Sequence, residues 1–193
     1  MISMVAINAN AADYIVDAAN ALNIGATNAS NNLLNTVYEI DVTVDEIGNV
    51  LGYTFEKAVS VTGVGDSITI SVGTWYFEGT QIYTSEINNI TITGSASGGI
   101  MNRSGLGTNP AISSQAQNLV LTNVNLVDNI GQGALTQSGA ATLDIIGGRI
   151  TGNSRNNENG GAIQNISSAD MTIDGTWFES NQASGSRGGA IYT

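Results

Sequence analysis

Carboxylates are the side chains best suited to chemistry in this chain, because it contains no histidine and no cysteine. Glycoside hydrolysis uses two carboxyl groups about 5 to 9.5 Å apart, one donating a proton while the other activates water or attacks the sugar. The acids in the second half of the chain are Asp128, Asp144, Glu158, Asp170, Asp174 and Glu179.

Asp144 and Asp174 come nearest to forming such a pair. They belong to two similar segments, 143–153 and 171–181, but lie at the second and fourth positions of those segments. Stacked copies of the segments would therefore not place the two carboxylates opposite each other. We expect these acids to be solvated outward side chains, and we predict that the chain is not an enzyme and has no catalytic residue.

A metal site is not expected either. The commonest ligands of transition metals, histidine and cysteine, are missing. The stretch DVTVDE (41–46) holds three acids, but they fall on a strand and a turn with no stacked partner. Neither an EF-hand loop nor a Gly-Gly-x-Gly-x-Asp repeat occurs. We therefore predict no metal ion and no other cofactor.

The charge balance excludes several partners. Five Lys or Arg face sixteen Asp or Glu, which gives a net charge of −11. Binding to nucleic-acid phosphates or to an anionic membrane surface needs clustered positive charge. No run of residues approaches the roughly 18 apolar residues of a membrane span. We expect no nucleic-acid partner and no membrane span in this chain.

A sequence motif occurs three times in the second half of the chain. Each copy opens with two apolar residues spaced by two, continues with an apolar residue three before a closing Asn, and ends on a Gly-Ala pair. These Gly-Ala pairs begin at residues 133, 161 and 189. The recurring residues are Leu126, Asn129, Gly133, Ala134 and Leu135, then Ile150, Asn153, Gly160, Gly161, Ala162 and Ile163, and finally Phe178, Asn181, Gly188, Gly189, Ala190 and Ile191.

This pattern predicts a β-solenoid. Apolar residues at i and i+2 lie on one face of a short strand, and one copy cannot bury that face alone, whereas stacked copies form a continuous core. The glycines would take positive φ at a corner. The closing Asn would sit in a turn, tolerate a left-handed conformation and form an amide ladder along the stack.

Upstream the pattern changes. The spacing of apolar residues predicts a helix in ADYIVDAANAL (12–22), and the polar stretch 23–32 predicts a loop. Residues 36–44 and 50–55 alternate as the two strands of a hairpin. A second short helix is expected within 55–63. We assign 1–35 to an arm, helix and polar loop, 36–66 to an N-terminal cap, and 67–193 to the solenoid, whose C-terminal end is open.

Three further features of the sequence carry an expectation. Trp75, Tyr76 and Phe77 could stack on sugar rings, but we expect them to cover an end of the core. The start of the chain, MISMVAINANAADY, resembles the end of a secretory signal, and the alternative is a β-prone arm. Asn-x-Ser/Thr sequons occur at Asn28, Asn89, Asn102 and Asn165, about as often as chance would give.

The phrases GGAI (160–163 and 188–191) and FESN (178–181) resemble the repeats of chlamydial polymorphic membrane proteins, which also occur in adhesin-like surface proteins of other bacteria and archaea. The resemblance covers roughly residues 119–193. Only the last copy carries both phrases, since Leu126 and Ile150 replace Phe and Gln132 replaces the first Gly. The stretches GVGDSITISVGTW and NITITG also resemble the opening coils of pectate-lyase-like β-helices.

The resemblance implies an all-β, right-handed parallel β-helix that is exported and acts at the cell surface. Its partner would be a host or neighbouring cell-surface receptor or a glycan. A first alternative is a fibre subunit that self-associates head to tail through the arm MISMVAI. A second alternative is a fragment of a carbohydrate-active β-helix enzyme.

Overall fold

The computed structural model consists of strands, and its described part contains no helix. The structure describes the backbone of 13–16, 27–28, 40–44, 46–47, 50–55, 59–61, 67–70, 73–77, 82–84, 89–94, 99–102 and 109–193, apart from 140, 169 and 186. Side chains are described at 46–47, 67–70, 82, 89–94, 100 and through 109–193 with the same gaps.

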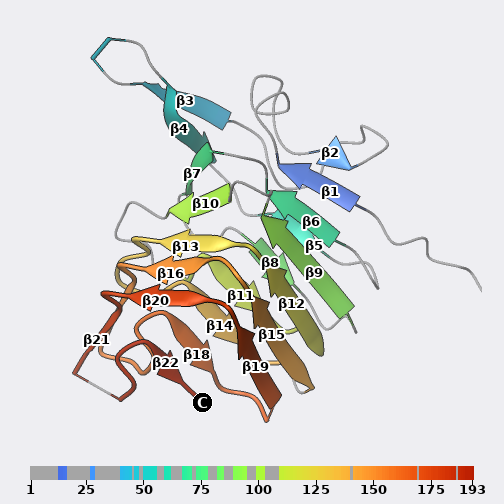
Figure 1. The fold of residues 1–193 in the computed structure, drawn as a ribbon, viewed down its shortest axis with the longest axis vertical. Coiled ribbons are helices and arrows are strands. Elements are labelled where there is room, and N and C mark those ends of the chain that lie inside the picture. Colours follow the sequence, from blue (N-terminus) through green and yellow to red (C-terminus); the bar gives the residue numbers. More distant parts are fainter. Residues whose placement is uncertain are drawn as a thin grey trace, which may run out of the picture.

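Three long sheets and one small sheet hold these strands (Figure 1). Sheet A contains, in spatial order, β19 (Asp170–Asp174), β15 (Thr142–Ile146), β12 (Asn118–Thr122), β9 (Asn89–Gly94), β6 (Ser67–Ile70), β1 (Asp13–Val16) and β2 (Thr27–Asn28). Sheet B contains β20 (Trp177–Glu179), β16 (Arg149–Thr151), β13 (Asn125–Val127), β10 (Gly99–Asn102), β7 (Gly73–Phe77), β4 (Val50–Phe55) and β3 (Ile40–Val44). Sheet C contains β22 (Ile191–Tyr192), β18 (Ile163–Asn165), β14 (Leu135–Gln137), β11 (Ile112–Ser114), β8 (Ile82–Thr84) and β5 (Val59–Val61), and sheet D contains β17 (Ser154–Asn156) and β21 (Gln182–Ser184).

The chain visits sheets A, B and C in turn and then returns one strand further along, so successive coils pair in parallel. From Asn118 to Tyr192 it completes three such coils, and the parallel register joins Leu119 to Leu143 and Leu143 to Met171. The predicted parallel β-solenoid is therefore confirmed.

The core is the stack of inward apolar side chains from these sheets. In β12 and β15 the alternate residues Leu119, Leu121, Leu143 and Ile145 are at most 2% exposed. Burying one such side chain contributes about 1.5–3 kcal/mol, which explains why the i, i+2 pattern determines the strands. In the last coil the corresponding inward residues are only partly buried: Met171, Ile173, Phe178 and Ile191.

One left-handed residue ends each strand of sheet B in these coils. Asp128 (φ 53°), Gly152 (φ 67°) and Ser180 (φ 54°) occupy equivalent positions. Each directly precedes a closing Asn, and Asn129, Asn153 and Asn181 are not themselves left-handed. The expectation that the closing Asn adopts this conformation is therefore wrong by one residue. The preceding residue makes the corner, which leaves the Asn side chain directed inward.

Among the three coils from Asn118 onward, length changes at a single corner. Asn129 and Asn153 are 24 residues apart, whereas Asn153 and Asn181 are 28 apart. The difference lies between the closing Asn and the strand of sheet C, where the two later coils have four more residues than the coil that leads to Leu135. The longer corners contain β17 and β21, which pair with each other as sheet D. The short corner that leads to Leu135 contains no such strand.

Upstream, two predicted helices are wrong and the predicted hairpin is present. Residues 13–16 of the predicted helix 12–22 form β1, with Tyr14 opposite Ile68 of β6, and 59–61 of the predicted helix 55–63 form β5 against β8. Helical spacing is a local signal, and parallel pairing with a remote strand overrides it. The hairpin is confirmed, since β3 and β4 pair antiparallel and β4 adjoins β7.

Other upstream expectations remain predictions. The capping role of 36–66 is one of them, because most of that segment's side chains lie outside the described residues. Residues 1–12 and most of the predicted loop 23–32 also lie outside the described residues. Trp75 lies in β7 at the register position shared with Met101 of the next coil, and the side chains of Trp75, Tyr76 and Phe77 are outside the described set.

Candidate functional site

The recurring residues of the sequence face the inside of the coil. In the first two of the three coils the apolar members are at most 1% exposed: Leu126, Ala134, Leu135, Ile150, Ala162 and Ile163. In the last coil Phe178, Ala190 and Ile191 are partly buried, and Gly188 and Gly189 are exposed. In the two earlier coils the phrase therefore specifies the scaffold, and the outward side chains are the ones that other molecules could contact.

The closing asparagines form a hydrogen-bonded ladder. Asn129 Nδ2 donates to Asn153 Oδ1 at 2.8 Å, and Asn153 Nδ2 donates to Asn181 Oδ1 at 2.9 Å. Asn153 Nδ2 also donates to the backbone oxygen of Leu126 at 2.9 Å. Asn129 and Asn153 are 0% exposed, and buried amides are stable only when they are hydrogen-bonded in this way. The predicted ladder is confirmed.

The Gly-Gly corner uses its two glycines for different reasons. Gly160 and Gly188 have φ of 71° and 70°, a conformation that glycine adopts without steric cost. Gly161 does not have positive φ, so the expectation of positive φ at that position is wrong. A Cβ on Gly161 would instead clash with the backbone oxygen of Gly189 and the backbone of Gln182. The second glycine thus permits close approach of the next coil.

Arg155 is a structural residue that the sequence analysis missed. It lies in the longer corner, on β17, and is 1% exposed. Its guanidinium donates to the backbone oxygens of Gly160 at 3.0 Å and Leu135 at 3.3 Å, and to Thr136 Oγ1 at 3.0 Å. The remaining nitrogen, Nη1, contacts Gln164 Oε1 and Glu158 Oε2, each at 3.2 Å. One side chain therefore ties the longer corner to two coils.

Burial and charge act on Arg155 in opposite directions. Desolvation lowers the pKa of its guanidinium, while the hydrogen bond and the negative charge of Glu158 raise it. Arginine nevertheless stays protonated throughout the usual pH range. The cost of burying its charge is therefore offset by its hydrogen bonds, with a small contribution from Glu158, whose side chain is 48% exposed.

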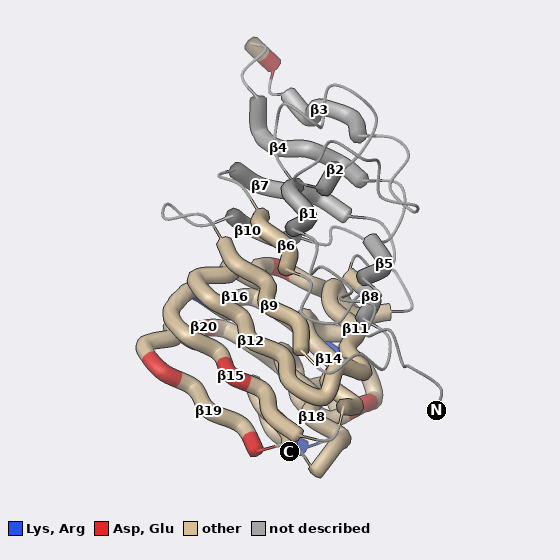
Figure 2. The backbone as a smooth tube through the Cα atoms, turned by 90° about the vertical axis from the view of Figure 1, so that its right-hand side faces the viewer, with Lys and Arg blue, Asp and Glu red and all other residues tan. Residues whose placement is uncertain are grey.

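The acids Asp144 and Asp174 do not lie directly opposite each other on neighbouring strands. Asp144 lies opposite Thr172, whereas Asp174 lies opposite Ile146, as the sequence spacing predicted. Figure 2 shows acidic positions on β15 and β19, within a surface that is otherwise mostly uncharged. Within the described residues no three acidic side chains gather closely enough to hold a metal ion.

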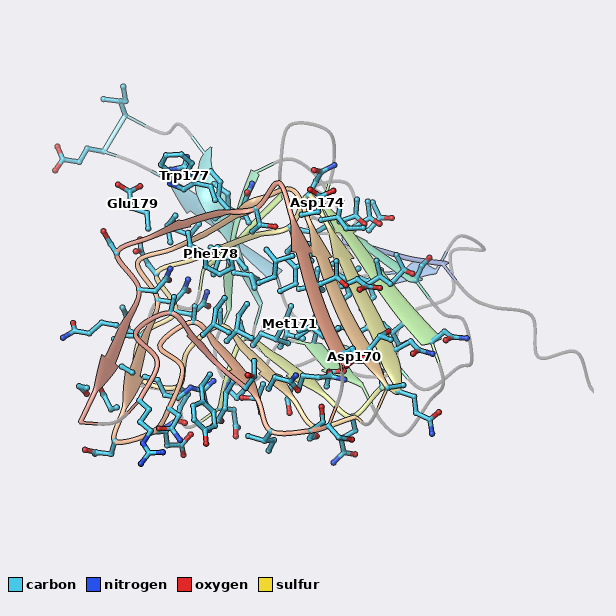
Figure 3. The ribbon with its side chains drawn as sticks, turned by 60° about the horizontal axis from the view of Figure 1, so that its bottom comes forward. Asp170, Met171, Asp174, Trp177, Phe178 and Glu179 are labelled. Carbon is cyan, nitrogen blue, oxygen red and sulfur yellow. The ribbon has the colours of Figure 1, made fainter. Side chains whose placement is uncertain are left out.

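A second feature missed by the sequence analysis is an outward Trp on sheet B. Trp177 is 60% exposed, and its indole Nε1 donates to Glu179 Oε2 at 3.3 Å. Arg149 lies opposite Trp177 on the neighbouring strand, and Thr151 lies opposite Glu179. Figure 3 shows Trp177 and Glu179 on the outer side of the last coil and Phe178 on the inner side. The alternation in WFE (177–179) was the signal for this arrangement.

One sequon is closed to modification in this fold. Asn165 is 2% exposed, and its Oδ1 accepts hydrogen bonds from the backbone nitrogen and the hydroxyl of Ser167. Asn89 is exposed instead, at the start of β9, where its Oδ1 accepts from Asn118 Nδ2 at 2.6 Å.

Comparison with known proteins identifies no relative: no family model, curated protein or solved structure matches the chain. In the described part of the chain there is no helix of the length and apolar character needed to cross a membrane.

Proposed function

We propose that this protein is a non-enzymatic, exported surface protein: a right-handed β-helix that acts as an adhesin-like passenger or structural module. The observation that carries the proposal is that the inward residues repeat from coil to coil whereas the outward residues vary. The recurring phrases pack inside the earlier coils, while the outward positions opposite one another change from coil to coil, as in Val120, Asp144 and Thr172. Such a scaffold presents a variable outer surface on a constant core.

The composition supports the same proposal. A regular surface with few Lys and Arg and a net charge of −11 is unsuited to nucleic acid. The partner that we propose is a receptor or glycan on a host or neighbouring cell. We propose no metal ion and no other cofactor for it; the described core is apolar, and its closing asparagines are joined by hydrogen bonds.

Adhesion can be measured directly. Beads coated with the purified chain should attach to epithelial or bacterial cells, and soluble chain should compete for that attachment. A matched control uses beads coated with the Ile145→Asp variant, whose fold should be lost. Absence of attachment to every cell type would contradict adhesion.

Release of new reducing ends from polysaccharides by the same preparation would instead support the enzyme alternative. Protease treatment of intact source cells tests surface exposure.

A fibre subunit is the second candidate, favoured by the edge of the last coil. Among the described strands, β19, β20 and β22 each pair on one side only, and the inward residues Met171, Ile173 and Phe178 are partly exposed. Unpaired edges of this kind accept an added strand, and a head-to-tail contact that does not close propagates as a filament. The arm MISMVAI is apolar enough to supply that strand.

Light scattering separates this candidate from the first. The mass of the intact chain should rise with concentration, and deletion of residues 1–9 should leave a monomer. A monomeric intact chain at high concentration, or fibres that persist after the deletion, would exclude the donated strand.

A further inference from the structure

The outward surface of sheet B around Trp177 has the properties of a sugar-binding platform. The platform consists of Trp177 and Glu179 on β20 and Arg149 and Thr151 on β16. Neighbouring strands are about 4.8 Å apart and alternate residues of one strand about 6.8 Å apart. These four side chains therefore lie within the footprint of a small ring. We propose that the platform binds a pyranose residue of a neutral polysaccharide, which stacks on the indole of Trp177.

The indole is presented for stacking. A single exposed apolar residue needs no explanation by itself, and Ile166, which is 58% exposed, is an example. Trp177 differs because its polar nitrogen is bonded to Glu179 and its backbone nitrogen donates to Gly148 at 3.1 Å. Its orientation is therefore restrained on a rigid strand. An aromatic face carries partial negative charge, which attracts the C–H groups of a pyranose face.

The surroundings of the indole favour a sugar over an apolar partner. Arg149 is exposed and forms no ion pair with another described residue, so its guanidinium is available to donate. Glu179 is exposed as well, with acceptor capacity beyond its bond to Trp177. A donor fork and a carboxylate beside an aromatic ring match the hydroxyl groups that ring a pyranose. The opposite charges of Arg149 and Glu179 favour a neutral sugar over an anionic one.

This inference rests on the proposed adhesive function and names the class of its partner. Native gel electrophoresis tests it with four neutral polysaccharides dissolved in the gel: hydroxyethyl cellulose, xylan, galactomannan and laminarin. At least one of them should retard the intact chain. Trp177→Ala should weaken this binding at least about tenfold, as truncation of a central aromatic does. Trp177→Phe should retain part of it, because the ring remains.

Ile166→Ala is the matched control, since it removes an equally exposed apolar side chain from a different corner and should bind as the intact chain does. Two results would overturn the platform: no retardation of the intact chain by any neutral polysaccharide, or equal retardation of Trp177→Ala. Retardation by alginate or heparin alone would overturn the assignment to neutral sugars.

The bead adhesion assay distinguishes failure of the sugar-binding platform from failure of the proposed adhesive function. If no neutral polysaccharide binds but beads carrying either the intact chain or Trp177→Ala still attach to cells, the platform is wrong and adhesion stands. If neither assay detects binding, both are wrong.

Discussion

The guanidinium of Arg155 lies against Gly133 of the preceding coil, so a Cβ on Gly133 would come within 2.9 Å of Arg155 Nη2. The absence of a side chain at Gly133 is therefore what admits the arginine. The relationship links a short corner to a longer one, because Gly133 belongs to the first of the three coils and Arg155 to the next.

Replacement of Arg155 should be costly, and replacement of its acidic partner should not. Arg155→Met leaves the buried backbone oxygens of Leu135 and Gly160 without this donor, and should lower the free energy of unfolding by about 2–3 kcal/mol. Glu158→Gln should cost less than about 1 kcal/mol, as exposed ion pairs do. Urea denaturation of the three chains measures both values. A larger loss for Glu158→Gln than for Arg155→Met would contradict the hydrogen-bond account.

The stability contributed by Arg155 should not vary with pH in the ordinary range. Because burial lowers the pKa of the group in the folded state, its deprotonation would favour folding, but only above that lowered pKa. Arginine remains protonated well beyond about pH 9. The difference in unfolding free energy between the parent chain and Arg155→Met should thus be constant from about pH 6 to 9. A steady trend across that range would show that another titrating group is coupled to the site.

The middle of the asparagine ladder should be its most sensitive position. Asn153 bonds to a ladder partner on each side and to the backbone oxygen of Leu126, whereas Asn181 has its ladder partner on one side and is partly exposed. Asn153→Ala should therefore cost about 2–4 kcal/mol, from several lost bonds and buried unsatisfied groups. Asn181→Ala should cost roughly half as much. Thermal denaturation monitored by circular dichroism ranks the two, and equal losses would argue against the ladder.

Substitutions at two glycines distinguish a steric clash from the cost of a left-handed backbone conformation. Gly161→Ala should destabilise the fold because its Cβ meets the backbone of Gln182 and Gly189, although φ is ordinary there. Gly175 has φ of 63° with nothing within 4 Å of a Cβ, so Gly175→Ala should cost about 1–2 kcal/mol from conformation alone. Gly175→Asn should recover part of that loss, since Asn tolerates the left-handed region. No comparable recovery is expected for Gly161→Asn in the same denaturation assay.

A charge in the core should abolish the coil. Ile145 is 2% exposed and lies between Leu121 and Ile173 in neighbouring strands. Ile145→Asp places a carboxylate in an apolar stack, with a cost of several kcal/mol. The parent chain should show a far-UV spectrum dominated by strand and a cooperative melt, and the variant should lose the melt. Ile146→Asp, on the exposed side of the same strand, is the matched control and should melt nearly as the parent does.

The parts of the fold that were predictable are those written in short, repeated patterns. Alternation at Leu119 and Leu121 fixed which side of the strand is buried, and the recurring Asn fixed the ladder. Arg155 was not predictable, because its partners Leu135 and Gly160 are brought to it by coil stacking, not by spacing in the sequence. For the same reason local helical spacing around Tyr14 was misleading, since the pairing of Tyr14 with Ile68 is non-local. Trp177 was predictable but missed, because alternation places it on the outside once Phe178 is assigned to the inside.

The corner between sheets B and C has a consequence for how such a surface can change over time. Four residues are gained there between one coil and the next, yet Leu126 still pairs with Ile150 and Leu135 with Ile163. Length variation at that corner is thus decoupled from strand register, and new loop sequences can be accommodated without redesign of the interior. The same tolerance makes the exposed residues 156–158, between Arg155 and Gly160, a suitable insertion point for foreign epitopes, provided that the backbone contacts of Arg155 are kept.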